Sequence, residues 1–296
     1  MNNGRYVIIT PAHNEAEFLP KTIKGIVSQK VRPLKWIVVD DRSDDDTWQI
    51  LQEAAQLHDW IVPVRIEGDE QRRVGANVVH VFNQGLEHLE DEVDFLVKMD
   101  ADVILPDNYF AVIISNFAEF QRLGMVSGKT YVRKDEDWIL ERIPDTHVSG
   151  ACKAYRWECF SEMGGLLPLL GWDILDGAKA RSLGWQTRSL RDLPLYHLRA
   201  SGSARGMLRA RIRTGRAMYT IRAHPLFVLG KSLFRAMEKP YLTGLLIPLG
   251  YIGSFFIRPP RLEDEDLARF LRGEQLGRLS GRTFGQEELL TRSFKN

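Results

Sequence analysis

The chain has 296 residues, of which 44% are hydrophobic and 27% are charged. This composition is typical of a folded protein with a substantial core and excludes an intrinsically disordered chain. The net charge of +1 hides an asymmetry, because residues 1–198 hold 22 Lys and Arg against 31 Asp and Glu (−9), whereas residues 199–296 hold 18 against 8 (+10). A basic second part indicates an anionic surface or ligand as its partner.

The first hundred residues alternate short apolar runs with helical patterns. Strands are expected at residues 5–10, 36–39, 60–66 and 94–99, and helices at 17–29, 47–57 and 76–89. This alternation predicts an α/β fold, a Rossmann-like αβα sandwich with a mainly parallel central sheet covered by helices on both faces. Polar clusters follow three of the strands, at residues 11–15, 40–46 and 100–102. Ligands of such sheets bind at the carboxyl ends of the strands, so these clusters mark a candidate site.

The chain from residue 127 to about 197 is less regular, and within it residues 172–183 predict a helix. Residues 199–261 then hold 12 basic residues and one acidic residue, Glu238. They include an uncharged stretch, Tyr241–Ile257, whose 17 residues are at the lower limit for a membrane span. Four Gly and Pro residues weaken a regular span, and we favour a segment that lies in the membrane interface or re-enters it. A core hairpin of a soluble domain and a true span stay as alternatives. The last two dozen residues predict a surface helix and a loose end.

Nucleic acid is a weaker candidate partner for the basic segment. Its Arg residues alternate with aliphatic side chains rather than with stacking aromatic ones, and the acidic first part would repel phosphate chains. We therefore expect no nucleic-acid partner. Cys152 and Cys159 are too few for a disulfide framework, and the first ten residues do not read as a signal peptide. Both features favour a cytoplasmic protein with reduced thiols.

Asp100 and Asp102 flank one residue directly after a predicted buried strand. Two carboxylates so placed can share a divalent cation, and hard oxygen ligands suit Mg²⁺ or Mn²⁺. The alternative is a pair of solvated loop carboxylates. Residues 40–46 hold five acidic residues in seven, which exceeds what capping of the next helix requires. Their carboxylates can accept hydrogen bonds from a base or a ribose, so they predict nucleoside recognition.

These segments together resemble a known family. Pro-Ala-His-Asn-Glu at 11–15, Val-Val-Asp-Asp-Arg-Ser-Asp-Asp-Asp-Thr at 38–47 and Asp-Ala-Asp at 100–102 resemble, in order and spacing, the inverting family 2 glycosyltransferases of GT-A fold. The segment 82–86 resembles the family's R-N-x-G-L, although Phe82 replaces the Arg, and 149–151 with 163–166 resemble its T-G-A and G-G-F stretches. The similarity covers about residues 5–200.

The resemblance implies a nucleotide-sugar site and a metal site. Pro11, Ala12, Asn14 and Glu15 would line the nucleoside pocket, and Asp40 and Asp41 would hold the base and ribose. Asp100 and Ala101 belong to the same donor site. Asp102, with Asp100 behind it, would hold Mg²⁺ or Mn²⁺ on the diphosphate. A late histidine reaches the metal in some such enzymes, so His197 is a third candidate ligand; a structural role is its alternative. Lys98, Arg72, Arg73 and Arg199 are weaker candidates for pairing with phosphates.

The resemblance also places a general base in the segment 171–176. Family members usually carry Glu-Asp there, and counting back from Gly184 puts Asp173 at the position of the base. Trp172 stands where the Glu is expected, and it could stack on an acceptor sugar. Asp176 follows one helical turn later and is a candidate acceptor contact. The alternative for Asp173 is a helix N-cap.

These observations lead to one functional hypothesis. We expect a metal-dependent inverting glycosyltransferase that moves a sugar from a nucleotide-diphosphate sugar to a hydroxyl or phosphate of a saccharide or lipid-linked acceptor. Residues 1–200 would form the catalytic domain, with a donor half at 1–105 and an acceptor half at 106–200. Residues 201–296 would form a helical region that attaches to the inner face of the cell membrane. A nucleotidyltransferase and an inactive membrane-associated scaffold of the same fold are the alternatives.

Overall fold

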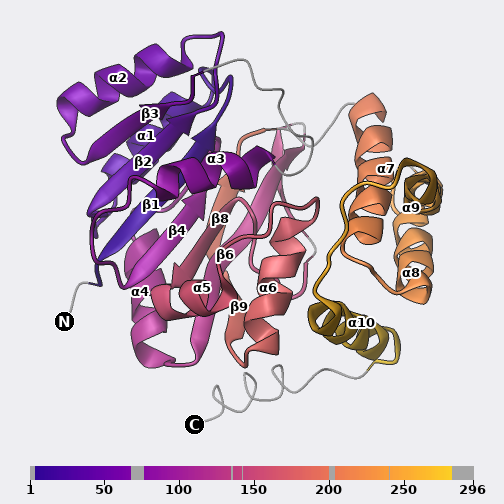
Figure 1. The fold of residues 1–296 in the computed structure, drawn as a ribbon. Coiled ribbons are helices and arrows are strands. Elements are labelled where there is room, and N and C mark those ends of the chain that lie inside the picture. The colour runs from indigo at the N-terminus through magenta and orange to yellow at the C-terminus, as the bar shows by residue number, and fades with distance from the viewer. Residues whose placement is uncertain are drawn as a thin grey trace. The chain divides into compact units, whose positions relative to one another are not determined.

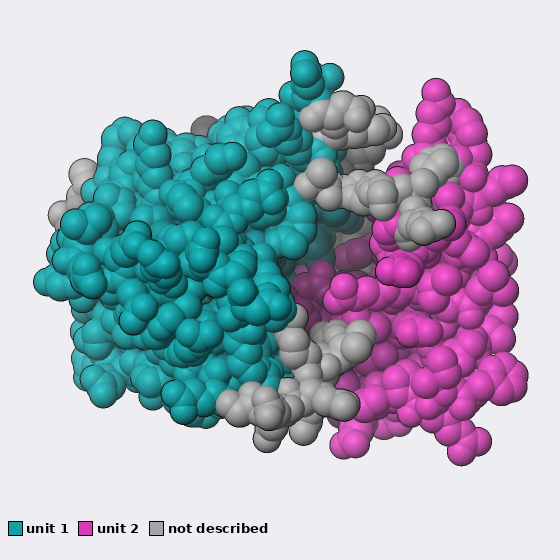
Figure 2. Space-filling model, turned by 90° about the horizontal axis from the view of Figure 1, so that it is seen from above, with its two compact units in different colours: residues 1–166, 183–200 teal, residues 167–182, 201–296 magenta. Residues whose placement is uncertain are grey.

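The computed structural model describes residues 4–67, 77–134, 136–141, 143–199, 204–239 and 241–281. The chain divides into two compact units (Figure 2). The first unit comprises Met1–Leu166 and Leu183–Ala200, and the second comprises Leu167–Ser182 and Ser201–Asn296. Residues 167–182 thus group with the basic C-terminal part, although they were expected in the catalytic domain. The functional division at residue 200 stays a prediction.

One nine-stranded sheet forms the centre of the first unit, in the order β3-β2-β1-β4-β8-β6-β9-β5, with β7 paired to β6 (Figure 1). Its strands are β1 (Tyr6–Ala12), β2 (Lys35–Asp40), β3 (Ile61–Arg65), β4 (Phe95–Met99), β5 (Val103–Ile104), β6 (Leu123–Lys134), β7 (Asp137–Leu140), β8 (Cys152–Arg156) and β9 (Gln186–His197). Its helices are α1 (Leu19–Val27), α2 (Thr47–Leu57), α3 (Asn77–Leu86), α4 (Tyr109–Glu119) and α5 (Trp157–Met163).

The expected parallel pairing is continuous in the first half of the sheet, whereas in the second half only β6 and β9 pair in parallel. Strands β3, β2, β1 and β4 are mutually parallel, whereas β8 is antiparallel to both β4 and β6. The reason lies in the connections. Helices link the first four strands, but β6 turns directly into the antiparallel β7, and the chain then reaches β8 without a helix. Parallel neighbours need a long crossover, which this part of the chain lacks. The sheet is therefore mixed.

Helices cover both faces of the sheet, as predicted. The core on one face joins α1, α2 and α4 to Ile8, Val38 and Val97. The alternate residues Ile9 and Val39 point to the other face, where Gly85 of α3 lies directly against them. Successive side chains of a strand point to opposite faces, so the continuous apolar runs supply both cores.

The second unit is helical. It contains α6 (Trp172–Ser182), α7 (Ala204–Thr220), α8 (Pro225–Ala236), the short 3₁₀ helix η1 (Thr243–Leu245), α9 (Leu246–Ile257) and α10 (Glu265–Leu279). Its core joins side chains from α6, α7, α8, α9 and α10, among them Leu175, Met218, Val228, Ile247 and Leu271. The uncharged stretch Tyr241–Ile257 thus forms η1 and a helix of 12 residues. Among the helices in the described ranges, none combines the length and apolarity needed to cross a membrane.

Replacing Gly85 with alanine tests the packing of α3 on the sheet. The new Cβ would lie 2.5 Å from Cγ2 of Ile9 and 2.9 Å from Cγ2 of Val39. We expect Gly85→Ala to lower the free energy of unfolding by about 1–3 kcal/mol, because such a contact forces the backbone or the core to shift. Urea unfolding followed by circular dichroism measures this change.

Gly25 in α1 provides the matched control within the same unit. A Cβ at Gly25 would meet only main-chain atoms of Leu105, at 3.8 Å and 3.9 Å. Gly25→Ala should raise the stability by about 0.5–1 kcal/mol, as expected for a helix interior. Equal midpoints for the two variants would contradict the described packing of α3.

Candidate active site

Four strands bring their carboxyl ends to one edge of the sheet. β1, β2 and β4 are parallel, and β9 has the same direction because it is parallel to β6, which two antiparallel pairings through β8 align with β4. The polar clusters that follow β1, β2 and β4 therefore meet at this edge, together with His197 at the end of β9. This is where ligands of open α/β sheets bind.

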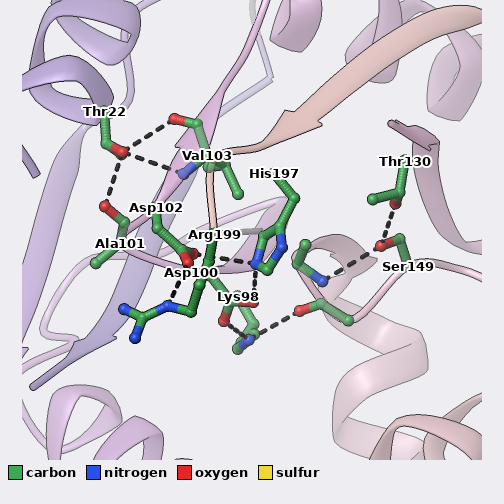
Figure 3. A network of polar contacts seen from close by, with 12 residues as sticks. Thr22, Lys98, Asp100, Ala101, Asp102, Val103, Thr130, Ser149, His197 and Arg199 are labelled. Carbon is green, nitrogen blue, oxygen red and sulfur yellow. Dashed lines mark hydrogen bonds and ion pairs between the residues drawn. The ribbon is translucent and has the colours of Figure 1, made fainter. Parts of the chain in front are cut away.

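A two-residue backbone pairing joins the Asp100–Asp102 segment to the end of β9. Val103 of β5 pairs with His197, and the Leu198 N–H donates to the Asp102 carbonyl at 2.8 Å. The buried hydroxyl of Thr22 holds the other side of the turn, since it lies 2.7 Å from the Ala101 carbonyl and accepts from the Val103 N–H at 3.2 Å. Asp102 and His197 are thereby fixed opposite each other (Figure 3).

Asp100, Asp102 and His197 bring one donor atom each to within 4.8 Å of one another. Nε2 of His197 lies 3.2 Å from Oδ1 of Asp102 and 3.9 Å from Oδ2 of Asp100 (Figure 3). Two carboxylate oxygens and one imidazole nitrogen form a donor set that accepts Mn²⁺ and, with more water ligands, Mg²⁺. The three predicted ligands thus come together, and their chemistry fits the expected cation.

Two basic side chains hold these carboxylates in place. Lys98, on β4, is buried and donates to a carboxylate oxygen of Asp100 and, at 2.8 Å, to the Gly150 carbonyl. Arg199 donates through Nε to Oδ2 of Asp102 at 3.1 Å and through Nη2 to the carboxylate of Glu15 at 2.5 Å. Arg199 therefore links the loop after β1 to the candidate metal ligands.

Glu15, Asp102 and His197 have pKa values that are shifted from their usual ones. Burial, reinforced by the charge of Asp102, raises the pKa of Glu15 to about 7, although Arg199 opposes the shift. Burial would also raise the pKa of Asp102, but hydrogen bonds from His197 and Arg199 outweigh it and lower that pKa. Burial lowers the pKa of His197, and the hydrogen bond and charge of Asp102 more than reverse the effect. Perturbed pKa values of this kind gather at functional sites.

Hydrogen bonds join the loop after β1 to the acidic loop after β2. Asn14 has a left-handed backbone (φ 55°), which Asn tolerates better than most residues, and its N–H donates to the Ser43 hydroxyl at 2.9 Å. Its side-chain oxygen accepts from the Asp44 N–H at 3.0 Å, and the Glu15 N–H donates to the Thr47 hydroxyl at 2.8 Å. Part of the acidic loop is therefore structural.

The remaining predicted donor residues lie along the same edge. Pro11 and Ala12 end β1 and pair with Val39 and Asp40. Asp40 is fully buried, and one of its oxygens accepts from the Ser43 N–H. The other oxygen has no hydrogen bond within the described residues and lies 3.4 Å from Nε of Arg65. Asp41 is also buried and accepts from Arg42 and Asn77, both at 2.6 Å. These residues reach the edge, and their ligand contacts stay predictions.

The predicted acceptor residues belong to the second unit. Asp173 lies in the first turn of α6 with its side chain partly exposed, whereas Trp172 and Asp176 are buried. One oxygen of Asp176 accepts from the Gly177 N–H at 2.6 Å. Arg72 and Arg73, the other phosphate candidates, lie outside the described residues.

Arg199 and Lys98 were only weaker candidates in the sequence, and Thr22 was not a candidate. Arg199 contacts Glu15 and Asp102, which precede it by 184 and 97 residues, so no local pattern marks it. Lys98 interrupts an otherwise apolar strand, and a charged residue at a fully buried strand position was a usable signal. Thr22 offers no signal beyond its polar side chain on the buried face of α1.

The chain is similar to known proteins in both sequence and structure. The model of the family described as "Glycosyl transferase family 2" matches residues 7–167, more than half of the chain. A poly-β-1,6-N-acetyl-D-glucosamine synthase of Staphylococcus aureus is 26% identical over 121 residues. That match covers 41% of this chain and only 27% of the relative, so the chain corresponds to about a quarter of the relative's length.

Two solved structures share the fold. A mannosyltransferase from Pyrobaculum calidifontis in complex with GDP-Man and Mn²⁺ aligns with 98% of this chain and 79% of its own, at a TM-score of 0.56 and 18% identity. Residues 1–349 of S. aureus TarS in complex with UDP align with 95% of this chain and 93% of their own, at a TM-score of 0.53 and 14% identity. The likeness shows the GT-A type of fold predicted from the sequence.

Replacing Asp102 with asparagine tests the candidate metal site. We expect Asp102→Asn to weaken Mn²⁺ binding by about 10–100-fold or more, because the change removes an anionic ligand and also frees His197 and Arg199. Electron paramagnetic resonance of free Mn²⁺ during a titration measures the affinity. Asp44→Asn is the control, because Asp44 is an exposed acidic residue of the neighbouring loop. Equal losses in the two variants would mean that Mn²⁺ responds only to the overall acidity of this edge.

Proposed function

Because the chain belongs to glycosyltransferase family 2, we propose that it transfers a sugar, with inversion, from a nucleotide-diphosphate sugar to a saccharide or lipid-linked acceptor. The observation that carries this proposal is the meeting of Asp100, Asp102 and His197 at the sheet edge where the loops after β1 and β2 also lie. A cation site beside a nucleoside pocket is what a diphosphate donor requires.

On the donor side, the two joined loops would form the nucleoside pocket. Asn14 and Glu15 are anchored through their main chains to Ser43 and Thr47, which fixes the pocket before the donor arrives. The buried oxygen of Asp40 that lacks a hydrogen bond is suited to accept one from a base or ribose. The main chains of Pro11 and Ala12 would form the floor of this pocket, and Ala101 would lie beside the sugar.

Asp100, Asp102 and His197 would hold the divalent cation. When bound, Mg²⁺ or Mn²⁺ would neutralise charge on the departing nucleoside diphosphate. Lys98 and Arg199 orient the carboxylates of Asp100 and Asp102 for this task. Arg199 also contacts Glu15 of the proposed donor pocket, so donor binding there would act on Arg199 as well.

On the acceptor side, Asp173 would remove the proton from the attacking hydroxyl. The hydroxyl oxygen would attack the anomeric carbon from the face opposite the diphosphate, which inverts the configuration there. Of the three predicted acceptor residues, Asp173 has the most exposed side chain, which favours it as the base. Trp172 and Asp176 would then shape the acceptor pocket around it. A phosphate acceptor needs no base, and Asp173 would then position the substrate.

The two alternatives have less support. A nucleotidyltransferase would normally carry a glycine-rich loop with Arg or Lys after the first strand, which residues 11–15 lack. An inactive scaffold has no need for three converged metal donors. The relative named as a poly-N-acetylglucosamine synthase supports a role in cell-surface polysaccharide or glycolipid synthesis.

We also propose that the second unit attaches to the cytoplasmic face of the membrane. Large apolar side chains are exposed along α8, η1, α9 and the turn between them, with Met237 69% and Phe256 85% exposed. We call this surface the apolar face, and it consists of Leu226, Leu229, Leu233, Phe234, Met237, Tyr241, Leu242, Leu245, Leu249, Ile252, Phe255, Phe256 and Ile257. Exposure of so many large apolar side chains on segments that follow one another in the chain favours an interaction surface.

The charge of the chain segment that contains the apolar face favours an anionic lipid surface as its partner. Residues 199–261 carry 12 basic residues and one acidic residue, and Arg209, Arg213, Arg216 and Arg258 are exposed. Each basic residue near an anionic membrane contributes about 1 kcal/mol. Apolar side chains that enter the interface add to this attraction.

Charged substitutions on the apolar face test the attachment. We expect the double variant Leu249→Glu, Phe256→Glu to bind phosphatidylglycerol-containing vesicles at least about tenfold more weakly, because each apolar side chain removed from water contributes roughly 1.5–3 kcal/mol. Co-sedimentation measures the bound fraction. Leu57→Glu is the control, because Leu57 is 79% exposed and lies in the first unit. Vesicle binding that is the same in both variants would rule out the apolar face as the contact.

Replacing Asp173 with asparagine tests the catalytic assignment. Nucleoside diphosphate release from a panel of UDP- and GDP-sugars with Mn²⁺ first identifies the donor. With a hydroxyl acceptor, Asp173→Asn should then lower kcat by about 100–10,000-fold, because general base catalysis contributes on that order. Asp266→Asn, an exposed carboxylate on α10, is the control. Full turnover by Asp173→Asn would refute the base, and calorimetry that detects no nucleotide-sugar binding would favour the scaffold.

A further inference from the structure

Four basic side chains from three helices of the second unit gather in one place. Arg211 lies on α7, Lys231 and Arg235 lie four residues apart on α8, and Arg278 lies near the end of α10. Residues four apart on a helix share a face. The end of α10 lies against α8 next to Lys231, because a Cβ on the preceding residue, Gly230, would lie 3.0 Å from Cδ2 of Leu279.

One carboxylate is shared between two of these side chains. Glu238 contacts two guanidinium groups at once, with its carboxylate 3.4 Å from Nη2 of Arg211 and 2.8 Å from Nη1 of Arg235. The Nε of Arg211 is buried and has no hydrogen-bond acceptor among the residues that the structure describes. A buried N–H donor without an acceptor costs free energy, so its presence calls for an explanation.

Lys231 is in a similar situation. It is partly buried, and three of its four main charged neighbours are Arg235, Arg278 and Arg211. The fourth is Asp173, the proposed base. Burial and the charge of Arg235 lower the pKa of Lys231 to about 8, against the opposing charge of Asp173. Four basic side chains therefore lie together, with the carboxylates of Glu238 and Asp173 beside them, and the cluster borders the proposed acceptor site.

We propose that Arg211, Lys231, Arg235 and Arg278 bind the phosphate group of a phosphorylated acceptor. Guanidinium and ammonium groups are the preferred protein ligands of phosphate, and the free Nε of Arg211 supplies a donor for one of its oxygens. The proposal of an anion site rests on the contacts within the cluster. Its assignment to the acceptor rests on the proposed function.

The surroundings of the cluster indicate which phosphate compound would fit. On α8, Phe234 is 50% exposed and its ring lies against Arg235, with the guanidinium carbon 5.9 Å from the ring centroid. Leu226, Leu229 and Leu233 form a different exposed side of the helix, which at about 3.6 residues per turn lies opposite Lys231 and Arg235. A phosphate held by the two basic residues would thus have the exposed ring of Phe234 next to it, which suits the headgroup of a phosphorylated lipid.

Inorganic phosphate is the first probe, used with the full chain and without sugar donor or divalent cation. Sodium phosphate should raise the Tm of the wild-type chain saturably beyond sodium chloride of equal ionic strength. We expect Lys231→Met to weaken this binding by about tenfold or more, and Arg235→Gln to do the same. Arg209→Gln, which removes a charge from the exposed side of α7, should leave it unchanged.

The variants also report on folding. Because Lys231 lies among like charges, Lys231→Met should keep or raise the Tm measured without phosphate, which separates lost binding from misfolding. A wild-type chain that shows no saturable phosphate response, or Lys231→Met and Arg209→Gln variants that respond equally, would overturn the proposal. Neither result bears on sugar transfer, because donor and metal are absent from the measurement.

Decyl phosphate is the second probe, and it distinguishes the two sources of the phosphate. If the acceptor is a lipid phosphate, decyl phosphate should bind at least about tenfold more tightly than inorganic phosphate, and Phe234→Ser should reduce that gain. Equal affinities for the two probes would retain the anion site and assign it to a water-soluble phosphorylated acceptor. Decyl phosphate binding that Lys231→Met leaves intact would contradict the site.

Discussion

The candidate active site depends on a short backbone pairing. Asp102 and His197 are 95 residues apart in the sequence, and they meet because Val103 pairs with His197 and the Leu198 N–H binds the Asp102 carbonyl. Main-chain hydrogen bonds leave little freedom in register, since a shift of one residue would turn His197 to the other face. The hydroxyl of Thr22 fixes the same turn from α1. The candidate metal ligands are therefore positioned by the sheet itself rather than by loops alone.

The same pairing also sets the charge balance of the site. It carries Arg199 to the sheet edge two residues after His197, so that one guanidinium contacts both Asp102 and Glu15. Lys98, on β4, pairs with the carboxylate of Asp100. Three buried or partly buried carboxylates are costly unless they are paired, and these basic groups make the cluster tolerable without a bound cation. A donor diphosphate and its cation would compete with these ion pairs, so their binding would rearrange the basic side chains.

The sequence predicted the first half of the fold better than the second for a physical reason. Strands β1, β2 and β4 are apolar on both faces and read as continuous runs. Strands β6, β8 and β9 bury Lys129, Lys153 and Arg188, so their patterns look irregular, and β8 runs antiparallel to β6 because no helix connects the two strands. The metal donors were identifiable because a motif marks Asp100 and Asp102. Arg199 could not be identified from a local pattern, because the residues that it contacts precede it by 97 and 184 positions.

The exposed apolar side chains of the second unit follow from how its helices pack. The backbones of α7 and α9 meet at glycines, since a Cβ on Gly215 would lie 2.0 Å from the Ile247 carbonyl and one on Gly250 would lie 2.2 Å from the Ile212 carbonyl. Helices that approach so closely exclude large side chains from their interface. Leu249, Ile252 and Phe256 are then left on the outside of α9, where a globular protein would bury them. The close approach of α7 and α9 is therefore the structural reason for the exposed apolar side chains on which the proposed membrane attachment rests.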